Sequence, residues 1–186
     1  MDQRVTKTKE TIHQAFYSAL KKKDYSAITI QDILNESQIS RSAFYAHFKS
    51  KEEVLLSITS DIFDHVFSRH LEGEKTHDFS QSSILDYWEY IEHYLYHLQD
   101  EKELISAILS NSCRPIVLQE TKEKIAPLAM IIIGEQKDRF EGLPSSLSAD
   151  MMTETIIKAT EYWLKDGCKE TPETIVEYVK KLSGCQ

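Results

Sequence analysis

Glycine and proline are scarce in this chain of 186 residues, which contains five glycines and four prolines. Both residue types favour turns, so their scarcity argues against a fold of many short strands joined by tight turns. Apolar residues recur mostly at helical spacing, and no convincing alternation of apolar and polar residues indicates a strand. The sequence therefore predicts an all-α fold.

Cysteines and long apolar runs are also few. Cys113, Cys168 and Cys185 are scattered and lack the spacing of metal ligands, so we expect reduced thiols rather than a disulfide framework. The apolar stretch 126–133 is too short to cross a bilayer, and no segment resembles a secretion signal. We therefore expect a cytoplasmic protein that does not associate with membranes.

Acidic side chains outnumber basic ones, and the net charge is -8. The excess lies in one part of the chain: residues 1–51 contain nine Lys and Arg against five Asp and Glu, whereas residues 52–186 contain thirteen against twenty-five. Attraction to DNA phosphates acts over roughly one Debye length of 8–10 Å, so a basic amino-terminal region can bind DNA despite the acidic total. This asymmetry predicts two domains with different tasks, 1–51 and 52–186.

The first of these domains shows the pattern of three helices. A helix with an apolar face is expected at about 6–22, and Thr29 caps a second helix with Asp32 at the capping-box position. Residues 38–39 leave space only for a tight turn before Ser40 caps the third helix. This order predicts a helix-turn-helix, a motif whose apolar face anchors it while its polar face contacts a DNA duplex.

Residues 40–48, Ser-Arg-Ser-Ala-Phe-Tyr-Ala-His-Phe, resemble the recognition helix of the TetR (tetracycline-repressor) family of bacterial transcription regulators, and the resemblance extends over residues 8–60. The chain has Gln38 in place of the usual turn glycine, so a strained backbone is expected there, and it has Ser42-Ala43 in place of the usual Gly-Thr pair. The resemblance implies base contacts from Arg41, Ser42, Tyr45 and His47, and phosphate contacts from Thr29, Tyr45 and Lys51.

Residues after 51 are predicted to form a helical domain for effector binding and dimerisation. Helices are expected at about 51–72, 83–99, 103–111, 115–140, 148–165 and 171–182, with a polar stretch at 73–81. Pro127 should cause a kink or break near Glu123. The last two helices are expected to form an antiparallel hairpin, which in the family provides the homodimer interface. The apolar face assigned to that interface comprises Met152, Ile156, Ala159, Trp163, Ile175, Val179 and Leu182.

Two sets of residues in this domain are candidates for a small-molecule or metal site. Glu89, His93 and His97 recur every four residues on one helix face, a spacing that can bind a divalent metal. We favour a solvated polar face there, and so expect neither a metal nor a cofactor. The aromatic residues at or near inward positions suit an effector pocket, with plain core packing as the alternative. They are Phe63, Phe67, Tyr87, Trp88, Tyr94 and Phe140.

The resemblance implies a ligand-responsive regulator, in most members a repressor, that binds double-stranded DNA. One recognition helix reaches too few base edges, so a homodimer on a palindromic operator is expected. An unidentified small-molecule effector would then change the distance between the two recognition helices. Two alternatives stay open: a helical interaction module of the same fold that has lost DNA binding, and an all-α enzyme. No catalytic motif is recognisable, so we expect no enzymatic activity.

Overall fold

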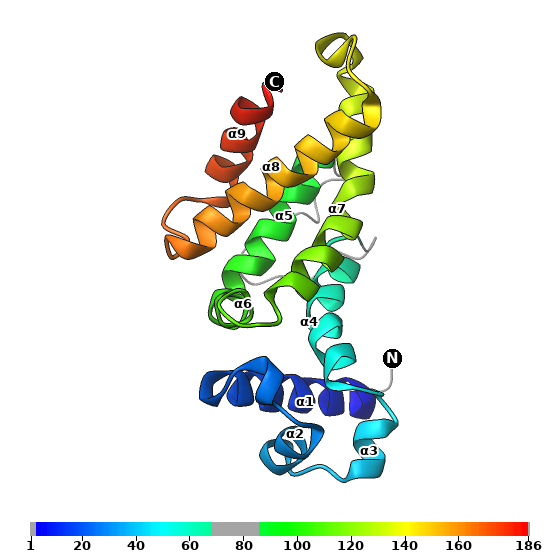
Figure 1. Ribbon diagram of the computed structural model, residues 1–186, viewed down its shortest axis with the longest axis vertical. Helices are drawn as coiled ribbons and strands as arrows, with labels where there is room; N and C mark the ends of the chain where they lie inside the picture. Colours follow the sequence, from blue (N-terminus) through cyan, green and yellow to red (C-terminus); the bar gives the residue numbers. More distant parts are fainter. Residues whose placement is uncertain (1–2, 68–85, 186) are drawn as a thin grey trace. The chain divides into compact units, whose positions relative to one another are not determined.

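The computed structural model describes residues 3–67 and 86–185, and within these ranges the chain consists only of helices, turns and loops (Figure 1). The predicted all-α fold is confirmed. The predicted polar stretch 73–81 lies outside the described residues, as do the expected end of one helix at 72 and the expected start of the next at 83. The described helices are α1 (Gln3–Lys22), α2 (Ile30–Ser37), α3 (Arg41–Tyr45), α4 (Lys51–Val66), α5 (Tyr87–Asp100), α6 (Lys102–Leu109), α7 (Arg114–Glu135), α8 (Ser145–Lys165) and α9 (Pro172–Ser183), with the short 3-10 helices η1 (Tyr25–Ala27) and η2 (Lys137–Phe140).

The chain divides into two compact units. The head unit comprises Met1–Asp61 and Glu103–Leu118, and the body unit comprises Ile62–Lys102 and Gln119–Gln186. Helix α4 therefore begins in the head unit and ends in the body unit. The two compact units are defined by contacts within the chain and not by task. The division into domains 1–51 and 52–186 with different tasks therefore stays a prediction. Among the helices within 3–67 and 86–185, none is long and apolar enough to cross a bilayer.

The head unit is built around the packing of α1 on α2. Ile12 and Phe16 of α1, Ile33 of α2 and Phe44 of α3 are all 0% exposed. Burying each such side chain contributes roughly 1.5–3 kcal/mol to folding. Figure 1 shows α1, α2 and α3 in the blue to cyan part of the chain. The full burial of Phe44 holds the short helix α3 in place within the head unit.

The body unit contains the predicted hairpin of α8 and α9, which pack on each other while α9 also packs on α5. The indole N–H of Trp163 donates a hydrogen bond of 2.8 Å to the carbonyl oxygen of Glu170 and so closes the connection between the two helices. Gly167 has a φ of 78°, which glycine adopts without strain. Thr171 then caps α9, and Pro172 occupies its first turn.

The apolar face assigned to the dimer interface is instead part of the body unit's own core. Leu182 alone among those seven residues is well exposed, at 73%. Side chains buried within one chain offer no surface to a second chain, so that assignment was wrong for the other six. Helical spacing identifies an apolar stripe, but it does not tell which partner covers the stripe. The six buried residues are Met152, Ile156, Ala159, Trp163, Ile175 and Val179.

Helix α7 runs without interruption from Arg114 to Glu135 and contains Pro127. The break that was one of the two predicted outcomes near Glu123 is therefore absent, while the alternative, a kink, stays a prediction. The expected continuation of this helix to 140 is replaced by η2, a separate turn of 3-10 helix.

Candidate nucleic-acid interface

The turn between α2 and α3 depends on the backbone of Gln38. Its φ of 58° and ψ of 20° lie in the left-handed region, which costs an L side chain conformational energy. The Gln38 N–H donates to the carbonyl oxygen of Leu34 at 3.0 Å and ends α2. Helix α3 begins after Ser40, whose hydroxyl accepts a hydrogen bond from the N–H of Ala43 at 3.1 Å. The predicted strain at Gln38 and the predicted cap at Ser40 are both present.

Helix α3 has one buried face and one exposed edge. Phe44 is fully buried and Phe48, just after the helix, is 2% exposed, with their ring centroids 6.1 Å apart. Arg41 and Ser42 are exposed, and Tyr45 is 47% exposed. The phenylalanines anchor the helix, so the three polar side chains are available to a partner.

Neighbouring groups order the polar edge of α3. The Arg41 guanidinium donates to Oε1 of Gln31 on α2 at 3.0 Å, and the Gln31 amide donates to Oδ1 of Asn35 at 2.8 Å. The hydroxyl groups of Ser40 and Ser42 lie 3.0 Å apart. Side chains that are already ordered lose less entropy on binding. Gln31 was not predicted as a functional residue, because its nearness to Arg41 depends on how α2 and α3 pack.

Thr29 stands at the amino end of α2 as predicted. Its hydroxyl accepts the N–H of Asp32 at 3.2 Å, while the Asp32 carboxylate accepts the N–H of Thr29 at 2.7 Å. The ammonium of Lys23 lies 2.7 Å from the same carboxylate. Hydrogen bonds from Lys23 and then Thr29 hold the pKa of Asp32 below its usual range. A phosphate at this helix end would therefore meet backbone N–H groups, one fixed negative charge and one positive charge.

His47 and Lys51 are less accessible than the other predicted DNA contacts, since both are half-buried. The Lys51 ammonium donates to the carbonyl oxygens of Tyr25 and Ile28, each at 2.7 Å, and lies 4.4 Å from the centroid of the Tyr25 ring. Lys51 therefore ties the first turn of α4 to the segment between α1 and α2. A phosphate contact from Lys51 stays a prediction, and the phosphate would compete with these carbonyl oxygens.

A second attachment of the same segment comes from the loop after α6. The side-chain oxygen of Asn111 accepts the N–H of Tyr25 at 2.6 Å, and the Ser112 hydroxyl donates to Asp24 at 2.5 Å. Hydrogen bonds from Ser112 and then Ser26 lower the pKa of Asp24. Nothing in the sequence distinguishes Asn111 and Ser112 from ordinary loop residues, so only the structure reveals that they hold the segment of Asp24 and Tyr25 within the head unit.

Two family models match this chain. Residues 12–58 match the bacterial regulatory proteins of the TetR family, and residues 86–184, more than half of the chain, match the transcriptional regulator C-terminal region of TetR type. The chain belongs to the TetR family. It is therefore a DNA-binding transcription regulator and not an enzyme.

Two relatives of this regulator in Bacillus subtilis are described as uncharacterized HTH-type transcriptional regulators. YxbF is 41% identical over 71 residues, which cover 36% of this chain and 19% of YxbF. YerO is 51% identical over 49 residues, which cover 26% of this chain and 17% of YerO. The matched region thus spans less than a fifth of either relative's length.

Solved structures of TetR-type regulators resemble the whole chain. A TetR transcriptional regulator from Streptococcus agalactiae has a TM-score of 0.66 and 26% identity, with 98% of this chain and 96% of that chain covered. NalD, described as the secondary repressor of the MexAB-OprM multidrug efflux pump in Pseudomonas aeruginosa, has a TM-score of 0.64 and 15% identity, with 96% of each chain covered. At that identity the likeness to NalD concerns the fold alone.

The aromatic residues assigned to the effector pocket of this TetR-family regulator are mostly packed against one another. Phe63 is 2% exposed and stacks on Tyr94 with ring centroids 4.6 Å apart, and Trp88 is 7% exposed. Burial raises the pKa of the Tyr94 phenol above its usual range. Phe67, in contrast, is 44% exposed, and Tyr87 is half-buried. This packing favours the core alternative for Phe63, Trp88 and Tyr94.

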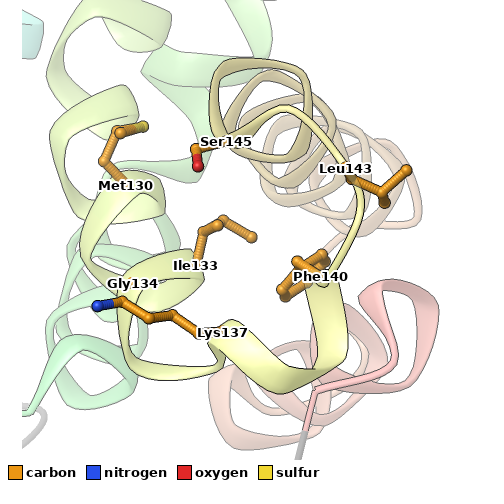
Figure 2. Close-up of a pocket in the computed structure, with 7 residues that line it drawn as sticks. All are labelled: Met130, Ile133, Gly134, Lys137, Phe140, Leu143 and Ser145. Carbon is orange, nitrogen blue, oxygen red and sulfur yellow. The ribbon is translucent and has the colours of Figure 1, made fainter.

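Phe140 lies apart from that cluster and lines a hollow of about 140 Å³. Figure 2 shows Ile133 of α7 and Phe140 of η2 directed toward the same space, with Leu143 and Ser145 on the following segment. Pockets for drug-sized ligands are about 300–1,000 Å³. The hollow is therefore too small to enclose such a ligand in the described conformation.

The three residues that recur along α5 do not form a solvated face. His93 is 0% exposed, so that prediction was wrong for it, and the Nε2 atoms of His93 and His97 lie 3.0 Å apart. Glu89 caps the helix, because its Oε2 accepts the N–H of Asp86 at 2.7 Å. A third imidazole, that of His65 on α4, lies beside the pair instead. Spacing along α5 could not identify His65, which belongs to another helix.

Proposed function

We propose that this TetR-family regulator is a cytoplasmic repressor that binds a palindromic operator as a homodimer and releases it when an effector binds. The observation that supports DNA reading is that α3 has a buried side, anchored by Phe44 and by Phe48 just after the helix, and an exposed polar edge. That edge offers Arg41, Ser42 and Tyr45 on a short helix that leaves its first turn uncovered. A helix of this size fits the major groove of a B-form duplex.

Arg41 is the proposed reader of guanine, since a guanidinium can donate two hydrogen bonds to O6 and N7 of that base. Gln31, which accepts a hydrogen bond from the Arg41 guanidinium, would either keep this bond beside the guanine or form a hydrogen bond to a neighbouring base. Ser42, Tyr45 and His47 are proposed as further base contacts, with Thr29 and Tyr45 on phosphates. Lys51 is also proposed as a phosphate contact. To bind a phosphate, its ammonium would have to give up a hydrogen bond to the carbonyl oxygen of Tyr25 or Ile28.

A homodimer is proposed because α3 is short and a single copy reaches few base edges. Two copies related by a two-fold axis would read two inverted half-sites about 34–36 Å, or one helical turn, apart. Half-sites that are related by the same two-fold axis make the operator a palindrome. Operator affinity then depends on the distance between two α3 helices, and an effector that changes this distance reduces the affinity.

The exposed apolar side chains of α8 and α9 provide the proposed dimer surface. They take the place of the six residues of the same two helices that are buried in the body unit. On α8 these side chains lie opposite the buried face, and large apolar groups gathered on a surface mark interaction sites. Leu182 of α9 belongs to both the original assignment and this one. The proposed contacts are Leu147 at 50% exposed, Met151 at 61%, Tyr162 at 62%, Tyr178 at 36% and Leu182 at 73%.

Selection of bound fragments from random double-stranded DNA tests the proposed function. The wild-type protein should enrich an inverted repeat at moderate salt. A double variant, Arg41→Ala with Ser42→Ala, serves as the control and should enrich the repeat far less, because it keeps the fold but loses two of the four proposed base contacts. Failure of the wild-type protein to enrich any sequence, even at low salt, would contradict DNA reading and favour an interaction module of the same fold.

A further inference from the structure

The imidazoles of His65, His93 and His97 converge in the body unit. His65 lies in the last turn of α4, and His93 and His97 lie one turn apart on α5. One ligand nitrogen from each ring lies within 4.8 Å of the other two. The ring centroid of His65 is 5.6 Å from that of His93 and 4.5 Å from that of His97. Two helices thus bring one imidazole nitrogen from each of three histidines within 4.8 Å of one another.

We propose that these three histidines form a site for a divalent transition-metal ion, with zinc as the preferred ion. Zinc binds histidine nitrogens at about 2.0–2.1 Å, so the nitrogens of a tetrahedral site lie roughly 3.3 Å apart. The 3.0 Å between the Nε2 atoms of His93 and His97 is close to that spacing. The ligand nitrogen of His65 lies within 4.8 Å of the other two, so a side-chain adjustment of at most roughly 1.5 Å would bring it into the same geometry.

The ligand set selects the class of ion. Imidazole suits zinc, copper and nickel, whereas calcium and magnesium require oxygen ligands. Three protein ligands leave a fourth position for water or another small ligand, as in zinc sites that exchange their ions or act on a substrate. Glu89, the acidic residue at the same helical spacing, is engaged by the N–H of Asp86 and does not belong to the set.

Hydrogen bonding and ring packing alone do not account for this arrangement of three histidines. A hydrogen bond between His93 and His97 needs only two rings, and a ring contact with His65 does not require its nitrogen to converge on theirs. His93 is 0% exposed, and a fully buried imidazole is costly unless its nitrogens have partners or bind a metal. Its burial also excludes bulk water from one side of the site, which strengthens coordination.

The placement of His65 suggests what the ion controls. Helix α4 begins in the head unit, where Lys51 binds the carbonyl oxygens of Tyr25 and Ile28, and ends in the body unit at the turn that carries His65. A bound ion would fix the end of α4 against α5. We therefore infer that the metal is the effector, a step that rests on the proposed function, and that it acts by favouring one position of α4.

Metal binding is tested on the metal-free, untagged protein without DNA, by calorimetric titration with Zn²⁺ and by the visible absorption of added Co²⁺. One ion per chain should bind, raise the melting temperature and give the intense bands of four-coordinate Co²⁺. His65→Gln and His97→Gln should each weaken Zn²⁺ binding by at least about tenfold, with Glu89→Gln as the control that binds like the wild type. Binding that survives in His65→Gln, or no binding at all, would overturn the site.

Coupling to DNA is tested on the selected operator with and without one equivalent of Zn²⁺. Operator affinity should change by roughly 5-fold to 150-fold in the wild type and stay constant in His65→Gln. Zinc binding by a protein that binds no operator would overturn the proposed function and leave the site intact. Operator binding without zinc binding would overturn the site alone, and zinc binding that leaves operator affinity unchanged would overturn the effector role.

Discussion

The ammonium of Lys51 donates a 2.7 Å hydrogen bond to the carbonyl oxygen of Ile28, 23 residues earlier in the chain. A second bond of the same length reaches the carbonyl oxygen of Tyr25. These two contacts hold the start of α4 against the residues that precede α2. Through them the position of α4 is linked to the helix-turn-helix, which is the link that an effector needs to influence DNA binding.

Replacement of Lys51 by alanine should lower the free energy of unfolding of the head. Partly buried carbonyl oxygens lose a charged donor, a loss of about 1–3 kcal/mol. Thermal unfolding measures the effect, and Lys49→Ala, which removes an exposed charge two residues earlier, should change stability by less than about 0.5 kcal/mol. DNA binding by the Lys51 variant should weaken alike on all operator sequences. Equal stability of the two variants would contradict the role assigned to Lys51.

Replacement of Arg41 by alanine should relax sequence preference. Loss of a bidentate contact to guanine costs about 1–3 kcal/mol on the preferred operator and little on an operator whose guanine is changed. Fluorescence anisotropy with both duplexes measures this difference. Lys165→Ala removes an exposed charge from α8 of the body unit and should preserve the preference. If Arg41→Ala lost the same affinity on both duplexes, Arg41 would be a phosphate contact.

Substitution of Gln38 by glycine should stabilise the turn between α2 and α3. The left-handed backbone at φ 58° costs a non-glycine residue roughly 1–2 kcal/mol, of which the variant recovers a part, because glycine also adds entropy to the unfolded chain. Denaturant unfolding measures the gain, which we expect to be about 0.5–1 kcal/mol. Gln38→Ala, which keeps the strain and shortens the side chain, is the control. A gain in the alanine variant as large as in the glycine variant would exclude backbone strain as the cause.

Tyr162→Asp should convert the proposed homodimer to a monomer. Tyr162 is 62% exposed on α8, and a charge placed inside an apolar interface is left without a partner. Sedimentation velocity measures the mass, and Ile131→Asp on α7, at a side chain 53% exposed, is the matched control that should stay dimeric. A dimer that persists in Tyr162→Asp with unchanged affinity would place the interface elsewhere.

Stability should fall as the pH is lowered from about 6.5 to about 4, in part because of His13. Burial and then the charge of Lys9 lower the pKa of His13 from 6.5 to about 4, while its Nε2 lies 2.7 Å from the Ser57 hydroxyl oxygen. The unfolded chain therefore binds a proton in this range that the folded chain does not, at a cost of at most roughly 3 kcal/mol. In His13→Gln the melting temperature should depend less on pH across this window. An unchanged pH dependence would contradict the contribution of His13.

The sequence is sufficient for the helix-turn-helix because its signals are local. Capping at Thr29 and Ser40, the turn at Gln38 and the buried Phe44 each depend on residues only a few positions apart. Local signals of the same kind predicted the hairpin of α8 and α9.

Features that depend on contacts between distant segments could not be predicted in this way. The stripe that includes Ile156 and Trp163 was correctly recognised as apolar, yet whether α5 and α9 or a second chain covers it depends on the packing of the body unit. His65 of α4 lies close to His93 of α5, a different helix. Asn111 accepts a hydrogen bond from Tyr25, which is 86 residues earlier in the chain. Periodicity along one helix contains no information about such partners.

The central claim is that two copies of α3 read two inverted half-sites through the edge that carries Arg41. Its most direct test is the affinity of the protein for the selected palindrome, compared with a duplex of equal length in which one half-site is scrambled. Scrambling several base pairs should lower the affinity at least about 100-fold, since each mismatch costs about 1–3 kcal/mol, and the intact duplex should bind two chains. Equal affinity for the two duplexes, or no retardation of either in dilute buffer, would contradict the claim.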